Sequence, residues 1–284
     1  MADLAKATAT VPTEQPGRRA AVLDEQWGIG PKLHGGYLLA LLAQAAVDEV
    51  EASGATGDGG TPEPAADAHV VPQAVTGTFL RAPDPGPAVV DVTVLRRGRS
   101  ATHVRALVSQ DDRPCVEAAM VLGAAPTDTP TDGDVSPEPI ALAPFEACER
   151  RPVAAEDGRG GLPIMEVVDT RFDPSSLGFL HGRPSGAGRL SGWAELDTRE
   201  PWSPIGLLVA LDLLPPACFD VGVYGWSPTM SLTAHVHAVP APGPLRVTQW
   251  LDHLVGDRMH ESCRVWDASG RMVGQAAQLA AVRR

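Results

Sequence analysis

The two halves of this 284-residue chain carry the same order of predicted elements, and this internal repeat constrains the fold more than any other feature. In the first half, HGGYLLALLAQAAVDEV at 34–50 predicts a helix, because its apolar residues recur at helical spacing and it is too long for a buried strand. Four segments rich in Val and Thr follow and predict strands, bounded by Gly, Pro and Asp turns, near 73–81, 87–96, 100–110 and 113–124.

The second half repeats this order. RLSGWAELD predicts a leading strand, and SPIGLLVALDLLPP predicts a helix with Ser203 as its N-cap and Pro204 at its first helical position. Pro215 and Pro216 end that helix. Four further strands are expected near 229–238, 244–255, 258–267 and 271–282.

The halves also superpose as sequences. FLRAPDPGPAVVDVTVL lies over HVHAVPAPGPLRVTQWL, and VSQDDRPCVEAAMVLGA lies over VWDASGRMVGQAAQLAA without a gap. One long helix followed by an antiparallel sheet, repeated in tandem, predicts an α+β protein with a double hotdog architecture, in which two curved sheets each wrap their own helix. An α+β protein whose halves are alike by coincidence is the alternative.

Composition divides the chain into four parts. Residues 1–20 are polar and contain Pro, which predicts a flexible tail before an N-terminal hotdog at 21–125. A stretch rich in Pro, Asp and Glu predicts a linker at 126–163 with one short ordered turn, and the C-terminal hotdog occupies 164–284. A Gly/Pro/Ala stretch at 53–66 predicts a loop inside the first half.

Charge and cysteine usage exclude several classes of protein. A formal net charge of −12 repels nucleic acid. No apolar run is long enough to span a membrane, and the first residues lack the apolar segment of a signal peptide. The cysteines are far apart and form no metal-binding cluster, so we expect reduced thiols, no metal site and a cytoplasmic location: Cys115, Cys148, Cys218 and Cys263.

Superposing the halves exposes three polar residues of the second half that lie opposite mainly apolar positions of the first. Asp212 lies opposite Leu42, Gln278 opposite Val121, and Thr229 near Pro72 or Gln73. Asp212 stands in a helix that is apolar on every face, where an unpaired carboxylate costs several kcal/mol or has a raised pKa. It is either a catalytic base or an anchor that accepts hydrogen bonds from a neighbouring loop.

The other two polar residues are weaker signals. Thr229 follows Pro228 at the start of a strand, which is usual for a turn residue. Gln278 is the only polar residue on its face of a strand of small side chains, and a buried amide needs hydrogen-bond partners. A water held together with Asp212 would satisfy it, and so would the backbone.

Two further features suggest substrate contacts. Gly35 and Gly36 open the first helix, where free amides favour negative charge and could stabilise an oxyanion; tight packing is the alternative. The arginines of RRGRS, Arg97 and Arg99 among them, could bind the phosphates of coenzyme A or be solvent-exposed residues without a specific role. His34 is expected to be a cap or a surface residue rather than a catalyst.

Four motifs in this order resemble the TesB-like acyl-CoA thioesterases: WGIxxxxHGGYLLAL (27–41), VLRxGRS (94–100), WSPTxSLTxH (226–235) and GRMVGQAAQ (270–278). The resemblance implies a double hotdog that hydrolyses fatty or related acyl-CoA esters. The family's Asp, Thr or Ser, and Gln around one water fall on Asp212, Thr229 and Gln278. It implies no cofactor beyond the coenzyme A of the substrate, and it leaves a homo-oligomer open.

Rival functions remain at this point. A serine hydrolase is rejected, since no GxSxG motif and no parallel βαβ pattern occur. A hotdog hydratase or dehydratase would, by family resemblance, pair an acid with a histidine, and 213–217 contain none, although a histidine from elsewhere could fold in. A non-catalytic acyl-CoA-binding protein is the third option.

Overall fold

The structure, a computed structural model, describes residues 3–54, 70–125, 135–150 and 162–283. Its α-helices are α1 (Leu4–Ala7), α2 (Gly35–Gly54), α3 (Ile164–Val167) and α4 (Leu207–Ala210). Short 3-10 helices are η1 (Glu25–Trp27), η3 (Phe145–Ala147), η4 (Pro174–Ser176), η5 (Gly178–His181) and η6 (Ala217–Val221).

Strands are the main secondary structure of the described residues. In the first half these are β1 (Thr10–Pro12), β2 (Arg18–Leu23), β3 (Gly28–Ile29), β4 (Lys32–Leu33), β5 (Val71–Phe79), β6 (Gly86–Arg97), β7 (Thr102–Gln110) and β8 (Arg113–Gly123). In the second half they are β9 (Glu149–Arg150), β10 (Val168–Phe172), β11 (Arg189–Leu196), β12 (Thr229–Val236), β13 (Leu245–Val255), β14 (Arg258–Trp266) and β15 (Met272–Ala281).

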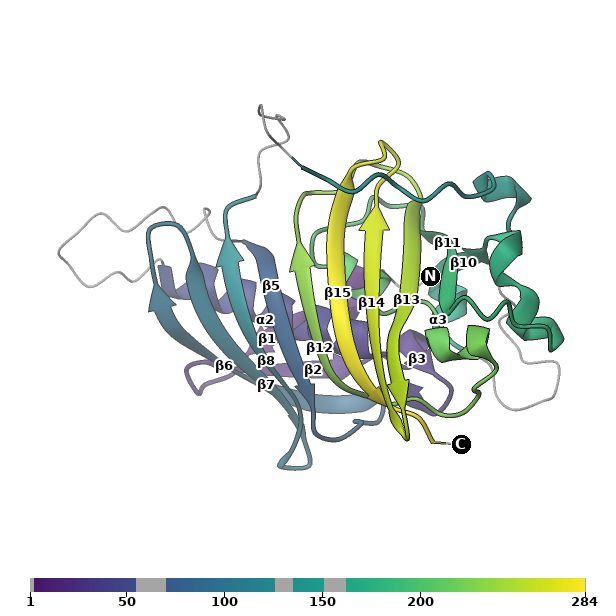
Figure 1. Cartoon of the computed structure of the whole chain (residues 1–284). Coiled ribbons are helices and arrows are strands. Elements are labelled where there is room, and N and C mark those ends of the chain that lie inside the picture. Colours follow the sequence, from purple (N-terminus) through teal and green to yellow (C-terminus); the bar gives the residue numbers. More distant parts are fainter. Residues whose placement is uncertain (1–2, 55–69, 126–134, 151–161, 284) are drawn as a thin grey trace.

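The two halves are joined into one antiparallel sheet with pseudo-two-fold symmetry. Thirteen strands follow the order β1-β2-β6-β7-β8-β5-β12-β15-β14-β13-β11-β10-β9, so β6-β7-β8-β5 is mirrored by β13-β14-β15-β12. The central pair is β5 and β12, with Val75 opposite Ala234. The double hotdog fold is confirmed, with the two predicted sheets fused edge to edge (Figure 1).

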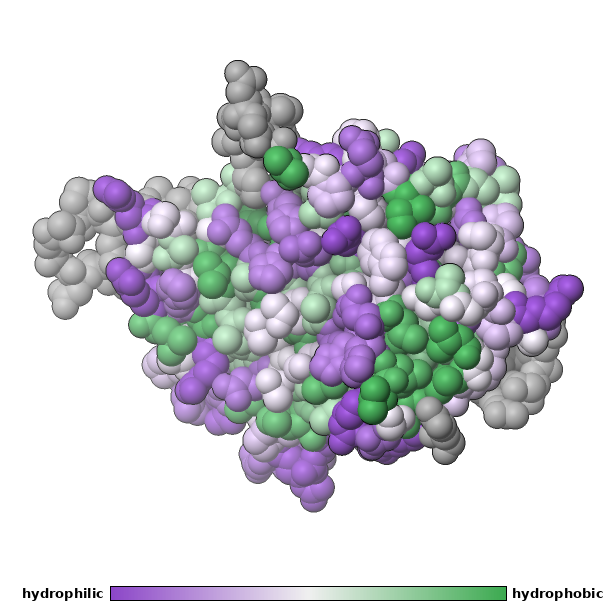
Figure 2. All heavy atoms as spheres, viewed as in Figure 1, coloured by the Kyte–Doolittle hydropathy of each residue, from purple (hydrophilic) through white to green (hydrophobic). Residues whose placement is uncertain are grey.

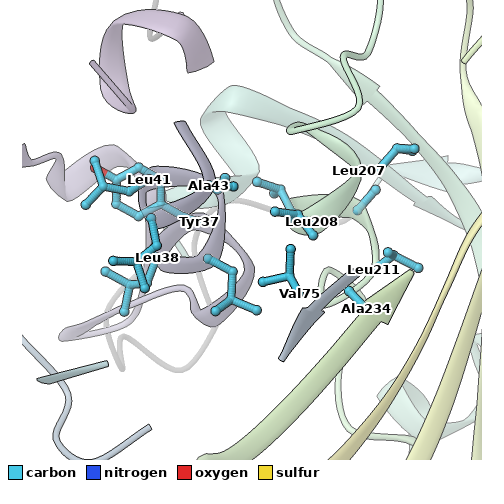
Figure 3. Packing of buried hydrophobic residues seen from close by; sticks show 14 of the residues in the cluster. Tyr37, Leu38, Leu41, Ala43, Val75, Leu207, Leu208, Leu211 and Ala234 are labelled. Atoms are coloured by element: carbon cyan, nitrogen blue, oxygen red, sulfur yellow. The ribbon is translucent and has the colours of Figure 1, made fainter. Parts of the chain in front are cut away.

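The long helix fills the core. In Figure 1, α2 runs behind the sheet. Its residues from Tyr37 to Leu42 are 2% exposed or less. A Cβ at Gly77 of β5 would lie 2.5 Å from Leu39 Cδ2, so this glycine lets the helix approach the sheet. Figure 3 shows α2 packed against the α4 region over the central strand pair, with side chains from Tyr37, Leu41, Leu208, Val75 and Ala234.

The second predicted helix is shorter than expected. Only Leu207–Ala210 is α-helical, with turns on either side. Ser203 does act as a cap, since its Oγ accepts from Gly206 N and its carbonyl accepts from Leu207 N. The bonds from Leu208 N to Ile205 O and from Asp212 N to Val209 O span three residues, so the segment is partly 3-10 and does not extend to Pro215.

The N-terminal segment differs from the predicted flexible tail. Among residues 3–20, Leu4 and Ala7 of α1 are buried, and β1 pairs with β2, which pairs in turn with β6. Arg19 is 6% exposed and forms an ion pair with Asp48 of α2. β2 is the counterpart of β11, so the first half also has a leading strand, which its polar composition concealed.

The connecting segments lie partly outside the described residues. The predicted loop at 53–66 is described only at its start, where Ser53 and Gly54 complete α2. Of the predicted linker at 126–163, residues 135–150 contain η3 and β9, and β9 pairs with β10. The rest of the linker is not described apart from 162–163, and the predicted domain boundaries stay predictions.

The sheet face opposite α2 is mixed in character. Figure 2 shows polar and apolar residues interspersed, with apolar residues gathered beside the lower end of β13. At the end of β13, half-buried Leu251 and Leu254 pair with buried Glu261 and Met259 and so point to the helix side of the sheet, while Val255 is exposed. Within the described ranges, no helix has the length and apolar character needed to cross a membrane.

Candidate active site

Asp212 lies at the junction of the two halves. Its Oδ2 accepts a hydrogen bond of 2.8 Å from Gly36 N at the start of α2, and its side chain is 9% exposed. Burial raises the pKa of Asp212, and nearby His34 and the Gly36 N–H oppose the rise. Among the described residues Oδ1 has no hydrogen-bond partner, so this atom is free to accept a proton.

His34 is fully buried beside this carboxylate and acts as the cap of α2. Its Nδ1 accepts from Tyr37 N (3.2 Å), and its carbonyl accepts from Leu38 N. That bond assigns the ring hydrogen to Nε2, which donates to the Asp212 carbonyl at 2.9 Å and lies 3.6 Å from Asp212 Oδ2. Both ring nitrogens are therefore occupied within the protein.

The two glycines make room for the second half. A Cβ at Gly35 would lie 2.7 Å from Asp212 Oδ2, and one at Gly36 would lie 2.3 Å from the carbonyl oxygen of Leu208. The Gly36 amide is bonded to Asp212. The prediction that the Gly36 amide is free to bind an oxyanion is therefore wrong for this structure, and tight packing describes this glycine better. An oxyanion contact at the Gly35 amide stays a prediction.

Thr229 reaches the inner face of the sheet through a β-bulge. In β12, Leu232 and Ala234 are buried beneath the sheet, so regular alternation would turn Thr229 outward with Ser231 and Thr233. Between Thr229 and Ser231 the pairing with β15 shifts by one residue. The extra residue, Met230, re-aims Thr229 to the side where Gln278 lies.

Thr229 and Gln278 belong to a chain of hydrogen bonds that ends on a buried carboxylate. Thr229 Oγ1 donates to Gln278 Oε1 at 3.1 Å, and Gln278 Nε2 donates to Glu261 Oε2 at 2.8 Å. Glu261 Oε2 also accepts from Gln249 Nε2 at 2.6 Å, and Oε1 accepts from Ala217 N at 2.5 Å. The predicted partners Thr229 and Gln278 are thus brought together, while no hydrogen bond among the described residues joins them directly to Asp212.

The charge of Asp212 acts on Glu261, the carboxyl at the end of this hydrogen-bond chain. Glu261 is 1% exposed, and burial raises its pKa from 4.5 to about 7, against the hydrogen bonds from Gln278, Ala217 and Gln249. The Asp212 charge adds to this rise. Burial and the charges of Asp212 and Glu261 also raise the pKa of Cys263, so that residue stays a neutral thiol. The two carboxyls therefore share one weakly screened environment.

The strand register changes the predicted first-half counterpart of Gln278. Val265 pairs with Gly274 in the second half, and Val108 pairs with Val116 in the first. The turn between these pairs is one residue longer in the second half, so the superposition without a gap is wrong from there on. The counterpart of Gln278 is Met120 rather than Val121. Met120 is 3% exposed, so the contrast between a polar and an apolar side chain holds.

The arginines predicted to bind phosphate lie elsewhere. Arg97 Nη2 donates to the Val50 carbonyl and to Ser53 Oγ, at the C-terminal end of α2. Val50 is fourteen residues from Gly36, which places Arg97 about 21 Å along the helix from the Asp212 contact. Arg97 thus stabilises a helix end, and Arg99 is an exposed residue in the following turn. The structure does not bring either to the site.

Two family models match most of the chain. The acyl-CoA thioesterase N-terminal domain matches residues 23–123, and the acyl-CoA thioesterase C-terminal domain matches residues 145–282. The chain belongs to the acyl-CoA thioesterase family. It is a TesB-like thioester hydrolase, as the motifs predicted.

Relatives extend over the whole length of this thioesterase. An uncharacterized protein of Mycobacterium tuberculosis is 34% identical in an alignment 274 residues long that covers 92% of this chain and 89% of the relative. A proposed thioesterase II from Thermobifida fusca YX has a structure with a TM-score of 0.82 and 29% identity, covering 100% of this chain and 98% of that one.

More distant structures share the fold alone. The acyl-CoA thioesterase II TesB2 from Mycobacterium marinum is 15% identical with a TM-score of 0.64, covering 99% of this chain and 98% of that chain. The PpsC dehydratase domain from Mycobacterium tuberculosis, in complex with C12:1-CoA, is 16% identical with a TM-score of 0.54, covering 98% and 99%. The fold therefore does not by itself separate hydrolysis from dehydration.

Sequence reasoning missed Glu261 and Gln249. A signal for Glu261 exists, because Met259, Cys263 and Val265 alternate with it on one strand and are buried. A carboxylate in that row has the same anomaly as Asp212 in its helix. Gln249 stands in a similar row with Leu245 and Val247.

Proposed function

We propose that this thioesterase hydrolyses fatty or related acyl-CoA esters by direct attack of water, with Asp212 as general base and with Thr229 and Gln278 as the groups that hold the water. The observation that carries the proposal is the hydrogen-bond chain from Thr229 through Gln278 to Glu261, beside a buried carboxylate with one unpaired oxygen.

The hydrogen-bond chain from Thr229 to Glu261 leaves acceptor positions toward which a water molecule can donate. Because the Thr229 hydroxyl donates to Gln278 Oε1, the lone pairs of Thr229 Oγ1 and the second lone pair of Gln278 Oε1 are available as acceptors. A water that donates one hydrogen to this pair and the other to Asp212 Oδ1 directs its own lone pair at the thioester carbon.

Proton and electron movements then balance without a covalent enzyme intermediate. Asp212 takes a proton as the water oxygen bonds to the carbonyl carbon, and a raised pKa makes its carboxylate a better base at neutral pH. The C–S bond breaks, the coenzyme A thiolate leaves, and the proton on Asp212 returns to the products as free acid and thiol. General-base assistance supplies about 10²–10⁴-fold of the rate.

The apolar residues beside Thr229 and Gln278 support a substrate with a hydrocarbon chain. Thr229 pairs with Ala280, which belongs to a buried apolar cluster with Cys218, Met259 and Val282. The half-buried Leu251 and Leu254 pack on that cluster and could meet a hydrocarbon chain. We also propose a cytoplasmic location, which four free, buried cysteines support.

The decisive experiment measures thiol release from acetyl-, hexanoyl-, decanoyl- and palmitoyl-CoA by the purified chain. We expect turnover by the wild type and a loss of at least about 10²-fold in kcat for Asp212→Asn, since an amide cannot accept the proton. Circular dichroism of both proteins controls for folding. Wild-type rates in a folded Asp212→Asn protein would remove the assignment of Asp212.

A hotdog hydratase or dehydratase is the second candidate, because a histidine does fold in beside Asp212. His34 Nε2 lies 3.6 Å from Asp212 Oδ2. Its nitrogens are nevertheless bonded to Tyr37 N and the Asp212 carbonyl, so it has no free position to act on a substrate. Hydration of an enoyl-CoA without thiol release would favour this candidate, and saturable acyl-CoA binding without either reaction would indicate a binding protein.

A further inference from the structure

Glu261 is a buried carboxyl that the proposed reaction does not use. It comes from β14 and has no cationic partner among the described residues, and each of its three hydrogen-bond partners is a donor: Ala217 N, Gln249 Nε2 and Gln278 Nε2. The ionised form matches these donors. A protonated Glu261 would need an acceptor, which only a reversed side-chain amide of Gln278 or Gln249 could supply.

The orientation of the Gln278 amide depends on this contact. With Nε2 on Glu261, Oε1 faces Thr229 and accepts its hydroxyl hydrogen. With the amide reversed, Nε2 would face Thr229 Oγ1 and the hydroxyl hydrogen would turn into the site. The water would then accept a hydrogen bond from Thr229 instead of donating one to it, and it would lose the orientation in which it donates to this pair and to Asp212 Oδ1.

We propose that Glu261 is a positioning residue for thioester hydrolysis, which fixes the Gln278 amide so that Thr229 and Gln278 present acceptors to the attacking water. The inference rests on the proposed function. It adds a group that touches neither substrate nor water and acts only through Gln278.

The titratable groups that face Glu261 are Asp212 near α4 and Cys263 on β14 itself. Burial raises the pKa of Glu261 to about 7, so its ionisation falls where activity is measured. Cys263 stays a thiol across that range because its pKa is raised. The fall of kcat at low pH, its acid limb, therefore reports the protonation of both Asp212 and Glu261. Variants are needed to separate the two contributions.

The first test is Glu261→Gln, with kcat and KM measured from pH 5.5 to 9 on the panel acyl-CoA that the wild type turns over fastest. A glutamine has the same size but can accept fewer bonds, so its own amide must donate to Gln278 Oε1 or to Gln249. We expect kcat to fall about 10- to 100-fold at pH 8, because misplaced water loses about that much rate. KM should change less than about threefold, since the substrate contacts remain.

The matched second variant is Gln249→Met, which removes the other amide from Glu261 Oε2 and leaves Gln278 untouched. Losing a donor to the ionised form raises the pKa of Glu261. We expect kcat at pH 9 within about threefold of wild type and an acid limb moved to higher pH. A merely structural role would lower the melting temperature without moving the limb.

Outcomes separate the two proposals. If the wild type turns over and Asp212→Asn does not, but Glu261→Gln has normal kcat and an unchanged limb, the positioning role is wrong and the proposed function stands. If Glu261→Gln fails to fold, the limb of Gln249→Met decides: a shift supports the role and an unmoved limb overturns it. A wild type without thiol release overturns both.

Discussion

At the scale of single residues, the candidate site consists of buried and half-buried polar side chains, most of which have hydrogen-bond partners within the protein. Asp212 was predictable because a carboxylate among Leu207–Leu214 contradicts its surroundings, and Gln278 because an amide among small residues needs partners. Glu261 could have been found by the same reasoning. The bond from Gly36 N to Asp212 could not, since it joins residues 176 positions apart.

The raised pKa of Glu261 has a consequence for stability. Its folded pKa of about 7 lies above the ordinary value of 4.5, so between these pH values the folded chain binds more protons than the unfolded chain. The free energy of unfolding should therefore fall as pH rises from about 4.5 to about 7, by about 3 kcal/mol at most, and level off above.

Urea unfolding of wild type and Glu261→Gln at pH 5, 6, 7 and 8 checks this. The stability of the wild type relative to the variant should decline across the series, because Asp212 titrates in both proteins and its contribution largely cancels. A constant difference would show that Glu261 has an ordinary pKa in the folded state.

At the scale of elements, register and close approach decide where side chains point. Strand ranges were predicted to within about two residues for β5–β8 and β11–β15 because Val-rich runs between Gly and Pro turns are strong local signals. The bulge at Met230 and the extra residue in the turn before β15 leave no such signal. They nevertheless determine that Thr229 faces inward and that Met120 is the counterpart of Gln278.

The close contact between Gly36 of α2 and the backbone of Leu208 in α4 gives a prediction for the packing of these two helices. Gly36→Ala would put a Cβ 2.3 Å from the Leu208 carbonyl oxygen, which is backbone and cannot simply move aside. We expect a loss of about 1–3 kcal/mol in the free energy of unfolding, together with a lower kcat as Asp212 loses its amide donor.

Gly206→Ala is the matched control on the facing segment. Its added Cβ would lie 3.2 Å from the side-chain atoms Leu4 Cδ2 and Trp202 Cε3. Its backbone neighbour, the Ser203 carbonyl oxygen, is 3.3 Å away instead of 2.3 Å, and its φ of −62° suits alanine. Denaturant unfolding and thiol release should both show a smaller effect than at Gly36. Equal effects at both positions would mean that the contact with Leu208 is not what requires Gly36.

At the scale of the whole molecule, the pairing of β5 with β12 makes one sheet and one main core from two repeats. The sequence repeat was sufficient to predict a double hotdog, because each half carries its own helix and strand order. It could not show that the first half would contribute His34 and Gly36 to the environment of a carboxylate from the second. That contact depends on how the repeats meet.

Pseudo-two-fold symmetry gives the proposed active site an equivalent location in the first half, where the polar side chains are replaced by apolar ones. The strand register puts Pro72 and Met120 at the positions of Thr229 and Gln278, and the sequence superposition puts Leu42 opposite Asp212. The stoichiometry of the enzyme should accordingly be one turnover centre per chain. Titration calorimetry can test this with a thioether analogue of the preferred acyl-CoA, which cannot be cleaved. We expect one equivalent bound per polypeptide. Two equivalents would mean that the first half also has a binding pocket, although it lacks the polar residues of the second.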